Sequence, residues 1–218
     1  MSLIDISPPL HPGIAVWPGD TRMSREVLAD FEGGGNLELS TLRTTVHLGA
    51  HADAPSHYRA DAPGIAAREL DRYYGPCQVI AVEVERGARI LPADIAERVS
   101  APRVLLRTRT FPDPDAFNED FAALSPELVA WLHEQGVGLV GIDTPSVDPF
   151  SSKALESHQA IADRDMAVLE GLVLDHVLPG NYTLIALPLP LVGFDASPVR
   201  AALLPAPTVR APSGDASE

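Results

Sequence analysis

Apolar runs alternate with a helical pattern through the middle of the chain. The runs at 77–84, 103–108 and 138–143 have the length and the residue types of buried β-strands. Between the last two, Ser125 is followed by proline and an acidic residue, which is typical of a helix N-terminus, and Gly136 follows the end of that helix. This alternation of strand, helix and strand predicts an α/β fold.

The two ends of the chain show shorter and weaker patterns. Further strands are expected at 3–6, 37–46 and 183–187, the last extended through 189–191, and short helices at 92–99 and 153–163. We find no internal repeat and no long low-complexity linker, so one domain over residues 1–204 is expected. Residues 205–218 are rich in proline, alanine and serine, which predicts a flexible tail.

Composition narrows the class of protein. The net charge of -14, from 16 basic and 30 acidic residues, argues against nucleic acid as a partner, because phosphate binding requires basic patches. No apolar run approaches the roughly 20 residues of a membrane span, and no signal peptide is recognisable, so a cytoplasmic protein is expected. The single cysteine, Cys77, lies within a predicted strand and is expected to be a buried thiol rather than a nucleophile.

Candidate chemistry is concentrated between positions 47 and 57. Three of the 7 histidines, His47, His51 and His57, lie there together with Asp53. Imidazole and carboxylate groups are the ligands that zinc, manganese and similar ions bind. Exposed loop histidines without a ligand are the alternative, but three histidines and an aspartate among small residues favour a metal site.

The same segment is not expected to be helical. Gly49 interrupts it, and Pro55 disfavours helical geometry at the preceding residue. A strand that runs out into a tight loop fits better, and on an extended chain His51 and Asp53 point to the same side. The helical metalloprotease motif also requires a glutamate after the first histidine, where this chain has Leu48.

One loop rarely supplies all the ligands of a metal site. His158 and Glu170 are the distant candidates, although a single histidine or glutamate is more often a surface residue. The remaining histidines, His11, His133 and His176, belong to no pattern of acidic or histidine neighbours like that of positions 47–57, and they are interpreted as structural or solvent-facing.

The segment between positions 47 and 57 resembles the signature His-x-Gly-Thr-His-x-Asp-x-Pro-x-His of the metal-dependent cyclase and formamidase family. The matching residues are His47, Gly49, His51, Asp53, Pro55 and His57. Ala50 replaces the usual threonine, and alanine at this position is typical of the family's bacterial kynurenine formamidase (arylformamidase) branch. The resemblance extends over nearly the whole chain, from about residue 3 to residue 204, through similar stretches at 5–9, 16–21, 75–77, 141–146 and 187–200.

The resemblance implies a fold and a site. The fold is the family's α/β architecture, a single domain with a central β-barrel-like mixed sheet flanked by helices. The implied metal ligands, with Asp53 bridging two ions, are His47, His51, Asp53, His158 and Glu170. His57 matches the catalytic histidine, and Trp17 matches a position that lines the substrate pocket, although sequence alone favours a core aromatic there. The expected cofactor is zinc, two ions per subunit, with manganese as the alternative, and the expected assembly is a homodimer.

The implied reaction is hydrolysis of N-formyl-L-kynurenine to L-kynurenine and formate in tryptophan degradation. Metal-activated water would attack the formyl carbon, and His57 would carry a proton to the leaving nitrogen. Asp143 and Asp148 are interpreted as turn residues rather than as partners of the ligands. Two alternatives stay open: a related amidohydrolase acting on another amide or cyclic imide, as isatin hydrolase does, and a metal-binding protein without turnover.

Overall fold

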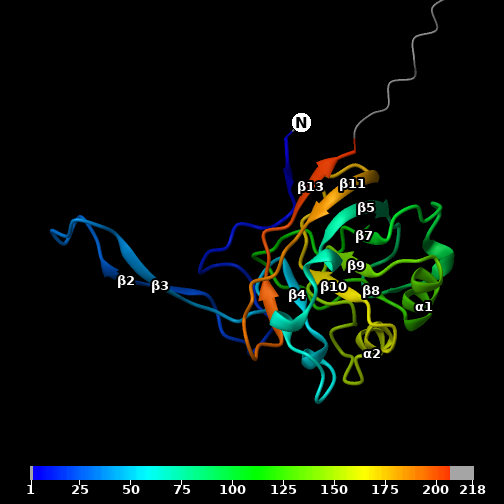
Figure 1. Cartoon of the computed structure of the whole chain (residues 1–218), viewed down its shortest axis with the longest axis horizontal. Helices are drawn as coiled ribbons and strands as arrows, with labels where there is room; N and C mark the ends of the chain where they lie inside the picture. The colour runs from blue at the N-terminus through cyan, green and yellow to red at the C-terminus, as the bar shows by residue number, and fades with distance from the viewer. Residues whose placement is uncertain (1, 207–218) are drawn as a thin grey trace, which may run out of the picture.

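Nine strands form one mixed sheet in the computed structural model, which describes residues 2–206 (Figure 1). Their order is β1-β13-β11-β5-β7-β9-β10-β4-β12, and the sheet curves into a half-barrel. Strands β5, β7, β9 and β10 are parallel to one another, and the flanking pairs are antiparallel. The strands are β1 (Ile4–Asp5), β4 (His51–Asp53), β5 (Tyr74–Ala81), β7 (Arg103–Arg107), β9 (Leu139–Ile142), β10 (Ala167–Glu170), β11 (Gly180–Ile185), β12 (Ala196–Pro198) and β13 (Ala202–Pro205).

Alternate residues of the central strands face two separate hydrophobic clusters. In β7, Val104 and Leu106 pack on the side of the two helices, whereas Leu105 packs on the opposite side of the sheet. This follows from the period of two along an extended chain. All three side chains are fully buried, and each such burial contributes roughly 1.5–3 kcal/mol to the stability of the fold. The sheet therefore has a core on each face, as expected for parallel strands.

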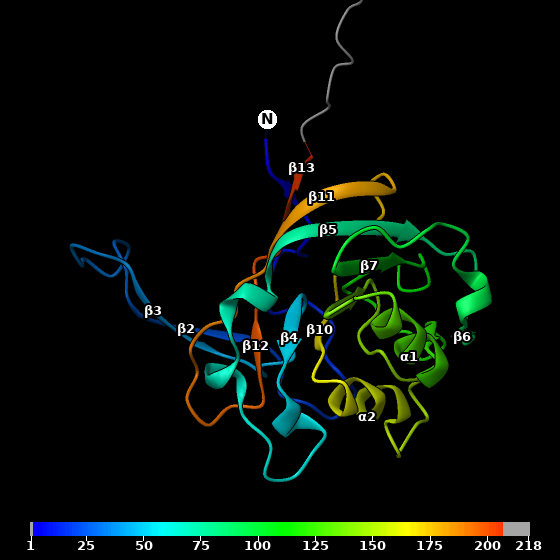
Figure 2. The same ribbon diagram turned by 45° about the vertical axis from the view of Figure 1, so that its right-hand side comes forward.

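Both helices cover the same face of the sheet (Figure 2). Helix α1 (Pro126–Glu134) begins where the Ser125 Oγ accepts a hydrogen bond from the Leu128 N–H, which satisfies one of the free donors of the first turn. It ends before Gly136, which has a φ of 86°. Helix α2 (Glu156–Asp163) buries Ala160 and Ile161 in the same cluster as α1.

A two-stranded arm extends away from the sheet (Figure 1). It consists of β2 (Ser24–Ala29) and β3 (Leu39–Arg43), which pair with each other in antiparallel fashion. Nearly all of its residues are exposed. The remaining short elements are β6 (Arg89–Ile90), paired with β8 (Ala123–Leu124), and the 3-10 turns η1 (Pro55–His57), η2 (Ile65–Ala67), η3 (Leu70–Arg72) and η4 (Pro92–Asp94).

The predicted α/β fold with a barrel-like mixed sheet is confirmed, and most of its central elements lie where the pattern put them. The helix expected at 92–99 is wrong, because only the turn Pro92–Asp94 forms. Ile95 after it is extended and buried against the helix-side core. A helix of eight residues is not stable on its own in water. The extended backbone at Ile95 instead lets its side chain pack into the core.

Two predictions near the ends of strands need correction. The strand expected at 37–46 covers only Leu39–Arg43 and belongs to the arm. The extension through 189–191 is absent, because Pro188 and Pro190 lack the N–H of a strand ladder and the Leu189 N–H donates to the Ser197 Oγ. The predicted tail begins at Pro205, the last residue of β13, and its residues 207–218 lie outside the described residues.

The sequence prediction for the single cysteine is confirmed within residues 2–206. Cys77 is buried in the core opposite the helices, and burial raises the pKa of its thiol to about 12. Neither helix of the described chain has the length and apolarity to cross a membrane. The domain boundary at residue 204 stays a prediction.

Candidate metal centre

Strand β4 presents two of its three side chains to the helix side of the sheet. His51 and Asp53 point to this side, whereas Ala50, Ala52 and Ala54 pack into the core on the other side. The small residues of the motif therefore serve as core residues of a short strand. Because alanines and polar residues alternate, β4 packs its alanines into the core on one side and presents two candidate metal ligands on the other, while all of its residues are buried.

Strand β10 brings Glu170 next to His51. The two residues are directly opposite each other in the antiparallel pairing of β10 with β4, and Val168 is opposite Asp53. The Glu170 Oε2 lies 3.3 Å from the His51 Nε2. Facing residues of an antiparallel pair share one side of the sheet, so the register of this pairing places both groups in the same cluster.

Helix α2 adds His158 from above the sheet. Its Nε2 lies 3.5 Å from the Asp53 Oδ2 and 3.3 Å from the Glu170 Oε1. Its Nδ1 donates to the Asp148 Oδ2 at 2.9 Å, and the same carboxylate accepts the backbone N–H groups of Ser157 and His158. Asp148 thus satisfies the first turn of α2 and orients the imidazole of His158, which leaves Nε2 to face the cluster.

His47 approaches the cluster from the loop before β4. Its Nδ1 is 3.0 Å from the Asp53 Oδ1, and the His51 Nε2 is 3.4 Å from the same oxygen. The loop is held by a close backbone approach, because a Cβ on Gly171 would lie 2.1 Å from the Gly49 carbonyl oxygen. That carbonyl also accepts a hydrogen bond from the His51 Nδ1 at 2.8 Å, so the His51 Nε2 is left free to bind a metal.

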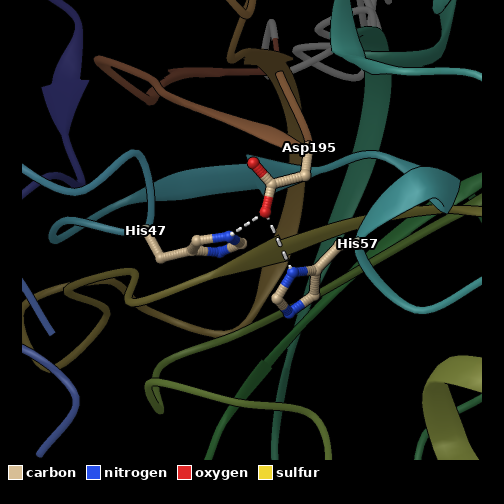
Figure 3. A group of neighbouring side chains, drawn as sticks. All are labelled: His47, His57 and Asp195. Carbon is tan, nitrogen blue, oxygen red and sulfur yellow. Dashed lines mark hydrogen bonds and ion pairs between the residues drawn. The ribbon is translucent and has the colours of Figure 1, made fainter. Parts of the chain in front are cut away.

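His57 lies at the open side of the cluster, in the turn that follows β4. Its side chain is 32% exposed, and its Nε2 is 3.9 Å from the Asp53 Oδ2. Its Nδ1 and the His47 Nε2 both contact one oxygen of Asp195, as Figure 3 shows. Asp195 directly precedes β12, the edge strand that pairs with β4.

A cavity of about 580 Å³ opens onto the cluster. The histidines and Glu170 line one part of it, and an aromatic group lines another. In that group the ring of Trp17 lies 5.5 Å from the ring of Phe117 in an edge-to-face arrangement. Trp17 is only partly buried. Its ring therefore both packs against other aromatic rings and forms part of the cavity wall.

The donor atoms of the cluster fit a metal ion. Among the described residues, the buried side-chain atoms without a hydrogen-bond partner include the His51 Nε2, the His158 Nε2 and both oxygens of Asp53. Such atoms are costly unless a ligand satisfies them. Potential ligand atoms from His47, His51 and Asp53 converge, and so do those from Asp53, His158 and Glu170. Three imidazoles and two carboxylates are a donor set suited to zinc or manganese.

The buried carboxylates of Asp53 and Glu170 are ionised, and nearby positive charge stabilises them. Burial alone would raise the pKa of Asp53, but its contacts with His158 and His47 hold that pKa well below the usual range. Burial likewise opposes the charged form of His47, yet Asp53 and Asp195 raise its pKa to about 9. Protonated imidazoles or bound cations can supply this positive charge.

The structure brings together His47, His51, Asp53, His57, His158 and Glu170, all of which the sequence singled out, and it places Trp17 in the wall of the adjoining cavity. The histidines interpreted as lying elsewhere, His11, His133 and His176, are exposed.

Two acidic residues of the site were not assigned from the sequence. Asp148 lies in a bend, as expected, but it is fully buried and holds His158, so a turn role alone is wrong. The sequence around Asp195 does not mark it as a residue of the site, because it lies far along the chain from the histidines that it contacts. Asp143, also interpreted as a turn residue, accepts the backbone N–H groups of Thr108 and Arg109 and lines the cavity.

Known proteins resemble this chain along most of its length. A family model described as "Putative cyclase" matches residues 4–149. The kynurenine formamidase of Bordetella petrii is 47% identical over 203 residues, which cover 92% of this chain and 97% of that protein. A solved structure described as a potential metal-dependent hydrolase with cyclase activity is 26% identical with a TM-score of 0.79, covering 93% of this chain and 96% of that one. Isatin hydrolase A from Labrenzia aggregata shares the fold, with a TM-score of 0.80 at 23% identity and 93% of each chain covered.

Proposed function

Because this chain belongs to the cyclase family and is a homologue of kynurenine formamidase, we propose that it hydrolyses N-formyl-L-kynurenine to L-kynurenine and formate. The observation that carries the proposal is the convergence of His51, Asp53 and His158, with unpartnered buried donor atoms, at the end of a cavity lined by aromatic residues. A metal-binding protein without turnover would not need a cavity of substrate size beside its ligands.

Two zinc ions per subunit are the proposed cofactors, with manganese as the alternative. His47, His51 and one oxygen of Asp53 would hold one ion, and His158, Glu170 and the other oxygen of Asp53 would hold the second. In support, the two oxygens of Asp53 face different histidines. Bound divalent ions supply Lewis acidity, which polarises a carbonyl group and makes water easier to deprotonate.

The proposed reaction consumes one water molecule. A C–O bond forms between the water oxygen and the formyl carbon, and the C–N bond to the aniline nitrogen breaks. His57 would take a proton from the attacking water and give it to the leaving nitrogen. Its location supports this role, because it lines the cavity and is more exposed than His51 or His158. No covalent intermediate with the protein is required.

Trp17 is the proposed platform for the aromatic ring of the substrate. The packed rings of Phe117 and Phe150 support its position, at 5.5 Å and 4.9 Å from the ring of Trp17. An indole held in this way loses little freedom when a second aromatic ring stacks on it.

A homodimer is the proposed assembly, and the β2–β3 arm is its proposed contact. The arm exposes large apolar side chains, namely Val27, Leu28, Phe31, Leu37, Leu39 and Leu42. An isolated two-stranded hairpin is marginally stable in water, and exposed apolar surface of this kind marks an interaction site. In a two-fold dimer each arm would be covered by the second copy, so that one contact stabilises both arms.

The function is tested by quantifying bound metals in the purified protein and by following formylkynurenine hydrolysis by absorbance, with and without a chelator. We expect metal-dependent release of kynurenine. Hydrolysis of cyclic imides or isatin without hydrolysis of formylkynurenine would favour the other amidohydrolases of this fold. Metal binding without turnover on any of these substrates would contradict an enzymatic function.

A further inference from the structure

One oxygen of Asp195 contacts two histidines that come from different parts of the site. Its Oδ2 is 3.1 Å from the His47 Nε2 and 3.3 Å from the His57 Nδ1 (Figure 3). A carboxylate only accepts hydrogen bonds, so the nitrogens that face Asp195 carry hydrogens. With a metal ion bound beside Asp53, the nitrogens left to offer a lone pair would be the His47 Nδ1, which faces Asp53, and the His57 Nε2.

Backbone pairing with β4 holds Asp195 in position. The next residue, Ala196, is directly opposite Asp53 in the pairing of β12 with β4. The carbonyl oxygen of Asp195 accepts the backbone N–H of Ala54 at 2.8 Å. The pairing of β12 with β4 therefore fixes the position of Asp195 relative to Asp53. The Asp195 side chain is 45% exposed, at the open side of the cluster.

We propose that Asp195 is a positioning residue that fixes the ring orientation and the tautomer of both His47 and His57, and so couples a metal ligand to the proton-transferring histidine. This inference rests on the proposed function, because it takes His57 as the proton-transferring group. Partners of this kind commonly change metal affinity or activity 10- to 100-fold when they are removed. Asp195 acts on both histidines through a single oxygen, so its loss affects two steps at once.

The decisive variants are Asp195→Asn and Asp195→Ala, with Asp175→Asn as the matched control. Asp175 has a similar exposure of 49% and contacts Arg109 instead of the cluster. With zinc supplied alone, we expect both Asp195 variants to bind the wild-type number of ions, with zinc affinity weakened by up to about 100-fold, and kcat at saturating zinc to fall about 10- to 100-fold with little change in KM. The control should match the wild type in both measurements.

A second readout is independent of activity. In zinc-loaded protein with ¹⁵N-labelled histidine, nuclear magnetic resonance should identify the hydrogen of His57 on Nδ1 in the wild type. In Asp195→Ala this preference should be lost, whereas in Asp175→Asn it should be retained.

Three results would overturn the proposal, and one would not. Loss of one whole zinc equivalent in Asp195→Asn would make Asp195 a ligand. Unchanged kcat, or an unchanged His57 tautomer in Asp195→Ala, would leave Asp195 without a positioning role. Absence of formylkynurenine hydrolysis in the wild type would contradict the proposed function, while the tautomer measurement would still decide the role of Asp195.

Discussion

Glu170 lies directly opposite His51 across the pairing of β10 with β4, and its Oε2 is 3.3 Å from the His51 Nε2. Both side chains are almost fully buried. The relationship depends on strand register, because a slip of one residue would turn one of these groups to the opposite core. The candidate metal centre is thus a product of sheet pairing as much as of the histidine motif.

Two histidine variants should separate metal binding from proton transfer. His51→Ala is expected to lose bound metal and activity together, because His51 is buried between Asp53 and Glu170. His57→Ala is expected to keep its metal and to lose turnover by about 10²- to 10⁴-fold, the range for a general acid–base group. Metal analysis and initial rates on both proteins check this. Full activity of His57→Ala would remove its assigned role.

Gly171→Ala should disturb the site from outside it. Gly171 has a φ of 64°, and an added Cβ would lie 2.1 Å from the Gly49 carbonyl oxygen. Because that contact is with backbone, the loop carrying His47 has to move. We expect a loss of stability beyond the roughly 1–2 kcal/mol of a left-handed alanine, together with weaker zinc binding.

The control for this variant is Gly136→Ala. Gly136 has a φ of 86° but nothing within 4 Å of an added Cβ, so it carries the backbone strain without the collision. Chemical denaturation and zinc titration of both variants make the comparison. Equal losses of stability and equal zinc affinities would refute the importance of the Gly49–Gly171 approach.

Much of this site was accessible from the sequence, for a physical reason. Metal binding is predicted because three imidazoles and a carboxylate lie in one short segment of the sequence. The alternation of side chains along β4 then places His51 and Asp53 on the same side. The strands and helices in the middle of the chain follow from strong apolar patterns and a helix cap.

The remainder depends on contacts that no local pattern encodes. Asp195 reaches the cluster through the pairing of β12 with β4, and Asp148 through its contact with the start of α2. The β2–β3 arm is not predicted as a unit. The sequence predicts a strand at 37–46 but none at the position of β2, and the apolar residues of both strands face solvent in the described chain. These features are long-range, so a single sequence carries no local signal for them.

Polar substitutions on the arm should break the proposed dimer. The double variant Leu28→Ser, Leu42→Ser removes two side chains that are 55% and 59% exposed, and we expect a shift from dimer to monomer in sedimentation velocity. Leu178→Ser is the control, since Leu178 is 75% exposed but lies outside the arm. A wild-type protein that sediments as a monomer, or a double variant that stays dimeric, would rule out this contact.

Trp17 variants should change substrate affinity more than turnover. Trp17→Ala removes the ring that packs on Phe117 and Phe150. The loss of an aromatic contact worth about 0.5–1.5 kcal/mol predicts a rise in KM of roughly 2- to 10-fold. Trp17→Phe should restore most of the affinity because it keeps an aromatic face. An unchanged KM in Trp17→Ala would return Trp17 to a purely structural role.

Removal of metal should lower the thermal stability of the protein. Asp53 and Glu170 are both buried in one cluster, and a cation that binds only the folded state stabilises it by about 2.7 kcal/mol at a concentration of 100 times its Kd. For a chain of this size that corresponds to a rise in Tm of about 5–10 °C. Differential scanning fluorimetry with chelator, and then with excess zinc, measures the shift.

The comparison of two histidine variants makes this last measurement specific. His51→Ala removes a buried candidate ligand, so its Tm should no longer respond to zinc, whereas His133→Ala changes an exposed residue of α1 and should keep the full response. An equal response in both variants would mean that zinc stabilises the protein somewhere other than at this cluster. A response lost only in His51→Ala ties the stabilisation to the atoms that β4, β10 and α2 bring together.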